Sequence, residues 1–321
     1  MTTGIPPPRA AIARDPLGRP APARLRRAPR VQTVWLLLRE AVSAWVAHRA
    51  SSLGAALAYY TAFSLAPLLL IAIAIAGLWV DSDVAARAIG AQVAALLGPR
   101  AAEGVEFMLR EAPHAASGWL AAVLGLAALI VGATTVLTEL QYDLDMIWRA
   151  PPRRSSGFVA AVWSRLLSFC LVVGIGFLFL VSLIVSTALS TLAAKGIEII
   201  PGSPALLTLA HVATWGVMLT LCFALLFKWL PYVRLAWSDV LAGALVTTLL
   251  FSIGRLLIGF YLAHSASASM HGAAGALIIL LLWFYYSSQV FLLGAEFTAA
   301  YAYGVGSMSR RPMPIETGGA A

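Results

Sequence analysis

The stretch ASSLGAALAYYTAFSLAPLLLIAIAIAGLWV, residues 50–80, has no charged side chain and lies between Arg49 and Asp81. A helix that crosses the hydrocarbon core of a membrane needs about 20 apolar residues, at a rise of about 1.5 Å per residue. The stretch is long enough for one such helix with residues to spare. It therefore predicts the first span of a membrane protein.

Five further apolar runs follow, and each is long enough for one spanning helix. They are 118–138, 165–195, 205–227, 240–262 and 273–300. The run 165–195 is long for one helix and too short for two helices with a turn, so we expect a single tilted or bent span. The pattern predicts an all-α polytopic membrane protein with six transmembrane helices.

Composition supports this fold class. Apolar residues make up 60% of the chain and charged residues 11%, and the mean hydropathy is +0.86. A soluble domain carries roughly a quarter charged residues, because its surface faces water. Cys170 and Cys222 both lie inside apolar runs, so we expect neither a disulfide framework nor a cysteine metal site.

The distribution of basic residues predicts the orientation. Nine arginines lie within the first 49 residues. With six spans, the other segments on the same side as the amino terminus hold Arg149, Arg153, Arg154, Lys228, Arg234, Arg310 and Arg311. The opposite side holds only Arg87, Arg100, Arg110 and Lys195. Basic residues accumulate on the cytoplasmic side, so we expect both termini in the cytoplasm and no nucleic-acid partner.

The chain ends and the outer loop complete the predicted organisation. Residues 1–30 are rich in proline and arginine and are expected to form a disordered cytoplasmic tail. A six-helix transmembrane domain is expected over 31–302, and 303–321 form a second cytoplasmic tail. Within the domain, 81–117 is expected to form short helices on the outer side of the membrane.

An amphipathic helix is predicted over 31–48, before the first span. Its apolar residues recur at spacings of three and four and are Val34, Leu37, Leu38, Ala41, Val42 and Trp45. Such a helix lies well along a membrane surface. Packing onto the protein's own helices is the alternative, and the sequence leaves both open.

The sequence offers no convergent set of catalytic or metal-binding groups. Its five histidines are scattered, and none has a spacing typical of metal ligands. Glu139, Asp143 and Asp145 form the densest carboxylate cluster. The simplest interpretation is a charged helix end at the cytoplasmic interface, with a metal site as the alternative. We expect no enzyme activity, no metal and no cofactor.

Polar groups inside the spans are the better candidates for function, because each is costly in lipid and normally faces protein or water. Arg255 lies about 25 Å along the fifth span, towards its outer end. It either extends to the outer headgroups or lines a cavity that meets an anionic substrate. Glu296 lies near the inner end of the sixth span, where a bond to neighbouring backbone or a loop arginine is the alternative role.

The first and sixth spans also contain polar patches. Pro67 removes the hydrogen bond to the carbonyl of Phe63, so we expect a kink there. Hydrogen-bonded helix packing is the alternative explanation for such residues. The full set of candidates for substrate binding or for lining a cavity is Tyr60, Ser64, Pro67, Arg255, Tyr285, Gln289 and Glu296.

Four ordered stretches resemble the YihY/virulence factor BrkB family, which was formerly labelled ribonuclease BN. They are 55–67 (AALAYYTAFSLAP), 140–149 with its Ile-Trp-Arg end, 230–234 (LPYVR) and 281–296 from LLWFY to GAE. The resemblance covers roughly residues 50–301. It implies a bacterial inner-membrane protein with six spans and both termini in the cytoplasm.

The resemblance leaves the function open. Members of the family have been labelled as ribonucleases, linked to serum resistance and connected with transport, including phospholipid movement. Hydrolysis of RNA normally requires clustered metal ligands or an acid–base pair on a wet surface, and the sequence shows neither. We expect a non-enzymatic transporter of a lipid or another amphiphile, with membrane lipids and other envelope proteins as partners. A membrane-bound hydrolase and an envelope scaffold are the alternatives.

Overall fold

The computed structural model describes residues 30–76, 132, 135–150, 174, 178, 181, 203–264 and 272–309. Its long helices are α2 (Arg30–Ala47), α3 (Ala50–Ala76), α8 (Ser203–Trp229), α9 (Trp237–His264) and α10 (Gly272–Gly304). A shorter helical segment covers 135–147. The described residues contain no strand, which confirms the all-α class for this part of the chain.

Three of the described helices are long and apolar enough to cross a membrane. The candidate spans are Val212–Trp229, Trp237–Ile258 and Ile278–Gly304, and they coincide with the predicted fourth, fifth and sixth spans. The first predicted span lies in α3, a continuous helix of 27 residues. The greater part of 118–138 and 165–195 lies outside the described residues, so the total of six remains a prediction.

The predicted tails and the outer segment also fall outside the described residues. Nothing in the structure bears on residues 1–29, 81–117 or 310–321.

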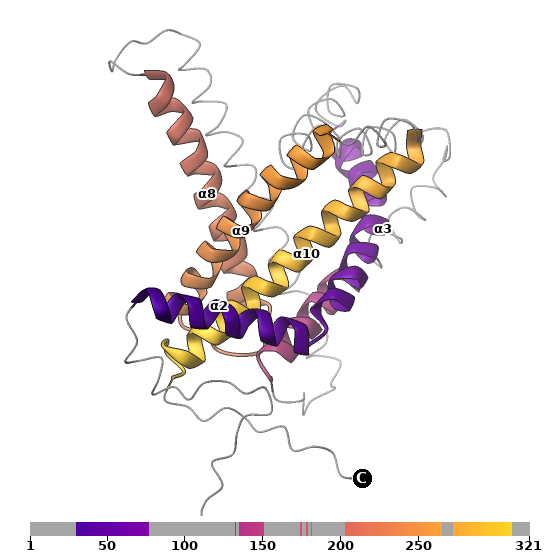
Figure 1. The fold of residues 1–321 in the computed structure, drawn as a ribbon. Coiled ribbons are helices and arrows are strands. Elements are labelled where there is room, and N and C mark those ends of the chain that lie inside the picture. Colours follow the sequence, from indigo (N-terminus) through magenta and orange to yellow (C-terminus); the bar gives the residue numbers. More distant parts are fainter. Residues whose placement is uncertain are drawn as a thin grey trace, which may run out of the picture.

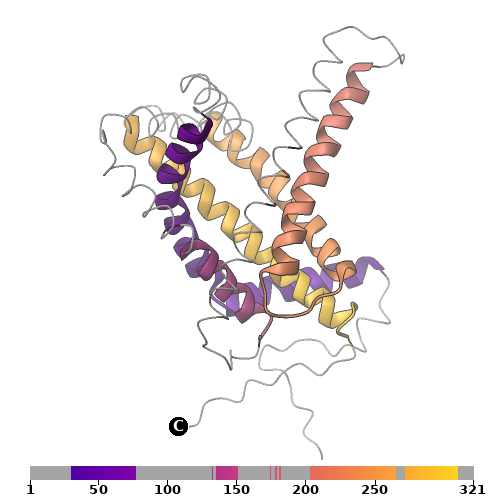
Figure 2. The same cartoon turned by 180° about the vertical axis from the view of Figure 1, so that it is seen from behind.

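Helix α10 lies at the centre of the described bundle. It packs against α2, α3 and α9, and α8 packs against α9. Figure 1 shows α2 lying across one end of the bundle, while the longer helices extend away from it. Seen from behind in Figure 2, the turn between α8 and α9 and the carboxyl end of α10 lie at this same end. We refer to it below as the α2 end.

Helix α2 has one packed face and one exposed apolar face. Leu37 and Ala41 are buried in a cluster with Phe297 and Ala300 of α10. On another face of the helix, Trp35 is 69% exposed, and several aliphatic side chains are exposed with it. One face of α2 therefore packs onto the protein's own helices. The other face is apolar and exposed.

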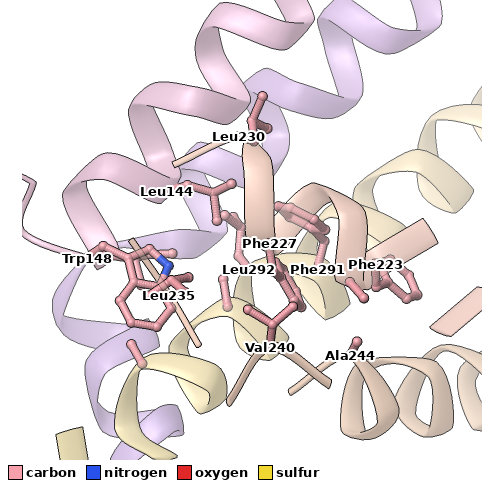
Figure 3. Close-up of a cluster of buried hydrophobic side chains, with 14 of the residues drawn as sticks. Leu144, Trp148, Phe223, Phe227, Leu230, Leu235, Val240, Ala244, Phe291 and Leu292 are labelled. Carbon is pink, nitrogen blue, oxygen red and sulfur yellow. The ribbon is translucent and has the colours of Figure 1, made fainter. Parts of the chain in front are cut away.

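The largest buried cluster lies at the α2 end and is built around aromatic rings (Figure 3). The ring centroids of Phe227 in α8 and Phe291 in α10 are 5.1 Å apart. Phe223 lies 6.3 Å from Phe291 and 5.9 Å from Phe251 in α9. Rings at these separations attract one another beyond the effect of burial alone, so the cluster joins α8, α9 and α10.

Helices α9 and α10 approach closely through two reciprocal glycine–threonine pairs, which we call the glycine–threonine seam. A Cβ added at Gly243 would lie 1.8 Å from Oγ1 of Thr298, and one at Gly294 would lie 1.9 Å from Oγ1 of Thr247. Each threonine hydroxyl donates to the carbonyl of the glycine one turn earlier in its own helix, at 2.8 and 2.6 Å. Small residues let spanning helices approach and associate in lipid, so this seam sets the spacing of the pair.

Candidate functional site

The described residues place the predicted site residues in two separate regions of the bundle. Gln289 and Glu296 lie where α10 meets α3 and the end of α2. Arg255 lies on α9 against a ring of α8. The candidates therefore do not form one site in the described part of the molecule.

Glu296 is paired with a histidine that lies far away in the sequence. Nδ1 of His48 lies 2.5 Å from Oε1 of Glu296. The Glu296 side chain is only 1% exposed, and that of His48 is 13% exposed. The partner is thus a titratable group from another element, rather than the neighbouring backbone or loop arginine that the sequence suggested.

The histidine sits at a sharp joint between two helices. Helix α2 ends at Ala47 and α3 begins at Ala50. Arg49, between them, has a φ of 53°, in the left-handed region that non-glycine residues seldom occupy. This joint turns the chain from α2, which lies across the α2 end, into the spanning direction of α3, and it presents His48 to α10.

A second polar contact lies two turns from Glu296 on α10. Nε2 of Gln289 donates to the carbonyl of Ser51 at 3.4 Å. A Cβ added at Gly54 would lie 2.2 Å from this nitrogen, so the glycine makes room for the amide. We call the contacts made by His48, Ser51 and Gly54 with Gln289 and Glu296 the polar seam.

The polar seam contains buried acceptors with no donor among the described residues. They are Oε2 of Glu296 and Oε1 of Gln289. Buried polar atoms in proteins normally have a hydrogen-bond partner, and one without a partner needs a specific explanation. The seam is therefore a place where a proton, a water or a ligand group can be bound.

Arg255 is held against an aromatic ring. Its Cζ lies 5.3 Å from the centroid of Trp215 in α8, a distance at which the ring attracts the cation. In the part of the chain that the structure describes, no carboxylate pairs with this guanidinium. The group is only partly buried, so its N–H groups can still meet an anion.

The remaining candidates show a packing role or no specific contact. The hydroxyl of Ser64 donates to the carbonyl of Thr61 at 3.0 Å, so it is satisfied within its own helix. Tyr60 contacts the neighbouring ring of Tyr59 edge to face, with centroids 5.7 Å apart. Tyr285 is partly buried.

The bend expected at Pro67 stays a prediction. The helix continues through this residue to Ala76, and it changes direction part-way along its length (Figures 1 and 2). The side chain of Pro67 lies outside those described. Proline in a helix interior is an ordinary cause of such a bend.

The acidic cluster joins the segment 135–147 to the turn between α8 and α9. Oδ1 of Asp145 accepts from the backbone N–H of Tyr232 at 2.8 Å, and Nε2 of Gln141 donates to the carbonyl of Leu230 at 2.9 Å. Among the described residues there is no group of three side chains suited to hold a metal ion. The contacts of Asp145 and Gln141 clamp the end of this segment to the turn.

Asp143 differs from its neighbours because it is fully buried. Neither of its carboxylate oxygens has a partner among the described residues. It lies beyond the end of the predicted second span. Burial, with a smaller contribution from nearby Glu139, raises the pKa of Asp143 from its ordinary 3.8 to about 7.

Comparison with known proteins identifies the family. Residues 41–314 match the model of the family described as Virulence factor BrkB. The chain belongs to this family. The match includes both the polar seam and Arg255, so both regions lie in the part of the chain that is typical of BrkB proteins.

The curated relatives named here are described as membrane proteins. The BrkB chain is 32% identical over 184 residues to a UPF0761 membrane protein of Tolumonas auensis, covering 55% of this chain and 56% of the relative. It is 29% identical over 257 residues to one of Pseudomonas paraeruginosa, covering 78% and 59%. The chain thus spans little more than half the length of these curated relatives. No solved structure matches it.

Two contacts in this BrkB chain were missed by reasoning from sequence. One is the pairing of His48 with Glu296. The other is Asp239, which is 1% exposed in the first turn of α9 and accepts hydrogen bonds from N and Oγ of Ser307 at 3.1 and 2.6 Å. A carboxylate in the first turn of a predicted helix signals a capping role, although it does not reveal the partner beyond α10.

Proposed function

We propose that this BrkB-family membrane protein moves a lipid or another anionic amphiphile across or out of the bacterial inner membrane, without enzymatic turnover. The observation that carries the proposal is Arg255. It is a partly buried guanidinium on a candidate membrane span, oriented by Trp215 and without a paired carboxylate among the described residues. Charged side chains within spans normally mark substrate pathways or bind a counter-charge.

The chemistry of arginine specifies the kind of ligand. A guanidinium donates two parallel hydrogen bonds to a phosphate or carboxylate, whereas a lysine acts as a point charge. Cζ of Arg255 lies over the ring of Trp215, 5.3 Å from its centroid, and the partly buried guanidinium retains some exposure for such a contact. A lipid headgroup phosphate has the matching charge and geometry.

We expect Arg255→Lys to insert and accumulate normally but to lose transport. Losing one of two hydrogen bonds in a bidentate contact costs about 1.4 kcal/mol, which corresponds to about a tenfold loss in rate. The measurement is the movement of a fluorescent phospholipid across proteoliposomes, read by quenching from outside. Arg39→Lys, at an exposed position of α2, is the matched control and should retain activity. Full activity of both Arg255→Lys and Arg255→Gln would show that Arg255 is only an anchor.

The rival activity is RNA hydrolysis, and it is tested on the same preparation. Cleavage of RNA by the purified protein with a divalent metal supplied, lost on substitution of Glu139, Asp143 or Asp145, would replace the transport proposal. Absence of both transport and cleavage would favour an envelope scaffold.

We further propose six spans with both termini in the cytoplasm. The turn between α8 and α9 and the carboxyl end of α10 lie with α2 at one end of the bundle (Figure 1), which supports their sharing one side. In a background without native cysteines, an impermeant thiol reagent added outside should label single cysteines placed within 81–117 and 263–272. It should not label 150–157 or 232–236. Labelling at Arg153→Cys from outside would contradict the six-span topology.

A further inference from the structure

The pairing of His48 with Glu296 has the features of a proton-binding site. Glu296 is buried within the helix that forms the centre of the described bundle, and the contact to His48 is its single hydrogen bond among the described residues. That partner is itself a proton acceptor, and it is the more exposed member of the pair. Protons from the aqueous side at the α2 end can therefore reach the carboxylate through the imidazole.

Counting protons defines what the pair binds. A separation of 2.5 Å between Nδ1 and Oε1 requires one proton between the two atoms. An imidazolium with a carboxylate, or an imidazole with a carboxylic acid, has no net charge. Removal of one proton from either form leaves a neutral imidazole that can still donate from Nδ1 to the carboxylate, with one net negative charge in a buried place. A net charge without a counter-charge is costly in a buried place, and the pair without net charge holds one exchangeable proton.

Loss of that proton has a structural consequence. A buried carboxylate whose Oε2 has no donor among the described residues gains from hydration, and we expect water to reach it where α10 meets the joint that carries His48. The joint contains Arg49 in its left-handed conformation and connects α2 to the bent helix α3. The contact between His48 and Glu296 therefore links the proton content of the pair to the packing of α10 against the joint.

We propose that His48 and Glu296 form a one-proton site that couples proton binding from the α2 end to movement of the α2–α3 joint against α10. This rests on the proposed transport function and adds an energy source to it. Intramembrane chains of acidic residues and histidine serve as proton relays in transporters. The site is separate from Arg255, which faces α8 and would bind the cargo.

Other titratable groups lie on the elements that pack around the pair, and each has its own place or partner. Asp239 of α9 is bonded to Ser307, and Arg255 faces Trp215. Glu40 lies two turns before His48 on α2, and Asp143 lies on the segment 135–147. Tyr59 of α3 is 54% exposed.

The test uses the full chain in proteoliposomes that contain a fluorescent phospholipid and a trapped pH-sensitive dye. We expect an imposed pH difference to change the rate of lipid movement about fivefold or more, the lower end of ordinary coupling, with matching proton flux in the dye signal. Glu296→Gln and His48→Gln both retain a hydrogen-bonding side chain but cannot hold the exchangeable proton. Both should abolish the effect of the pH difference and the proton flux.

Asp239→Asn is the matched control, because it alters another buried carboxylate near the same end of the bundle, and it should keep the coupling. Size-exclusion profiles show that each variant is folded. If lipid moves equally with and without the pH difference, or if both glutamine variants retain coupling, the proton site is wrong and the transport proposal stands. If no lipid moves but a proton flux is lost in both glutamine variants, the transport proposal is wrong and the proton site stands. Absence of lipid movement and of proton flux overturns both.

Discussion

Gly243→Leu should prevent most of the protein from accumulating in a folded form. A side chain at position 243 would overlap Thr298, because even its Cβ would lie 1.8 Å from the threonine oxygen and 2.7 Å from the threonine Cβ. Overpacking a close contact typically destabilises the folded protein by about 1–3 kcal/mol. The loss is larger where two helix backbones must move apart. The measurement is the yield of monodisperse protein after detergent extraction, together with its thermal unfolding temperature.

The chain supplies a control and a rescue for this prediction. Among the described residues, Gly216 in α8 has no neighbouring atom within 4 Å of an added Cβ, so Gly216→Leu should be tolerated. Exchanging the partners, as Gly243→Thr with Thr298→Gly, returns one small and one large side chain to the contact and should recover much of the yield. Equal yields from Gly243→Leu and Gly216→Leu would show that the glycine–threonine seam does not control the assembly of α9 with α10.

Asp143→Asn should stabilise the protein at pH 8 and leave it nearly unchanged near pH 4. The pKa of Asp143 is raised in the folded protein from 3.8 to about 7. The folded state therefore binds the proton more tightly than the unfolded state does. The resulting stabilisation is present below pH 3.8 and is lost as the pH rises through 7, a difference of up to about 4 kcal/mol. Asparagine cannot ionise, so the stability of Asp143→Asn does not fall in this way as the pH rises.

Thermal unfolding of the wild type and the variant between pH 5 and 8 measures the effect. The wild-type curve should fall as the pH rises, and the curve of Asp143→Asn should be flatter. Asp145→Asn is the control, because Asp145 accepts a hydrogen bond from Tyr232 and its replacement should give no gain in stability. Parallel curves for the wild type and Asp143→Asn would contradict the raised pKa.

The helices of the described part were predictable because each follows from a local property of the sequence. An apolar run without charges specifies a spanning helix by its length alone, and the candidate spans in α8, α9 and α10 lie where those runs lie.

The lateral contacts were not predictable in this way. His48 and Glu296 are separated by 248 positions, and the hydropathy pattern fixes the depth of a helix but not its neighbours. Asp143 was interpreted as part of a charged helix end at the interface, yet it is buried. It shares a helix face with Leu140 and Ile147, and that spacing was the available signal of an inward position.

The central place of α10 determines when the bundle can be completed during synthesis. Helices α2, α3 and α9 all pack against α10, and all three leave the ribosome before it. Until α10 enters the membrane, His48 lacks its partner Glu296 and Asp239 lacks its contact with Ser307. The glycine–threonine seam then has only the residues that α9 contributes. The earlier helices therefore cannot complete these contacts until α10 has entered the membrane, and the carboxyl-terminal part of the chain sets the moment at which this part of the bundle closes.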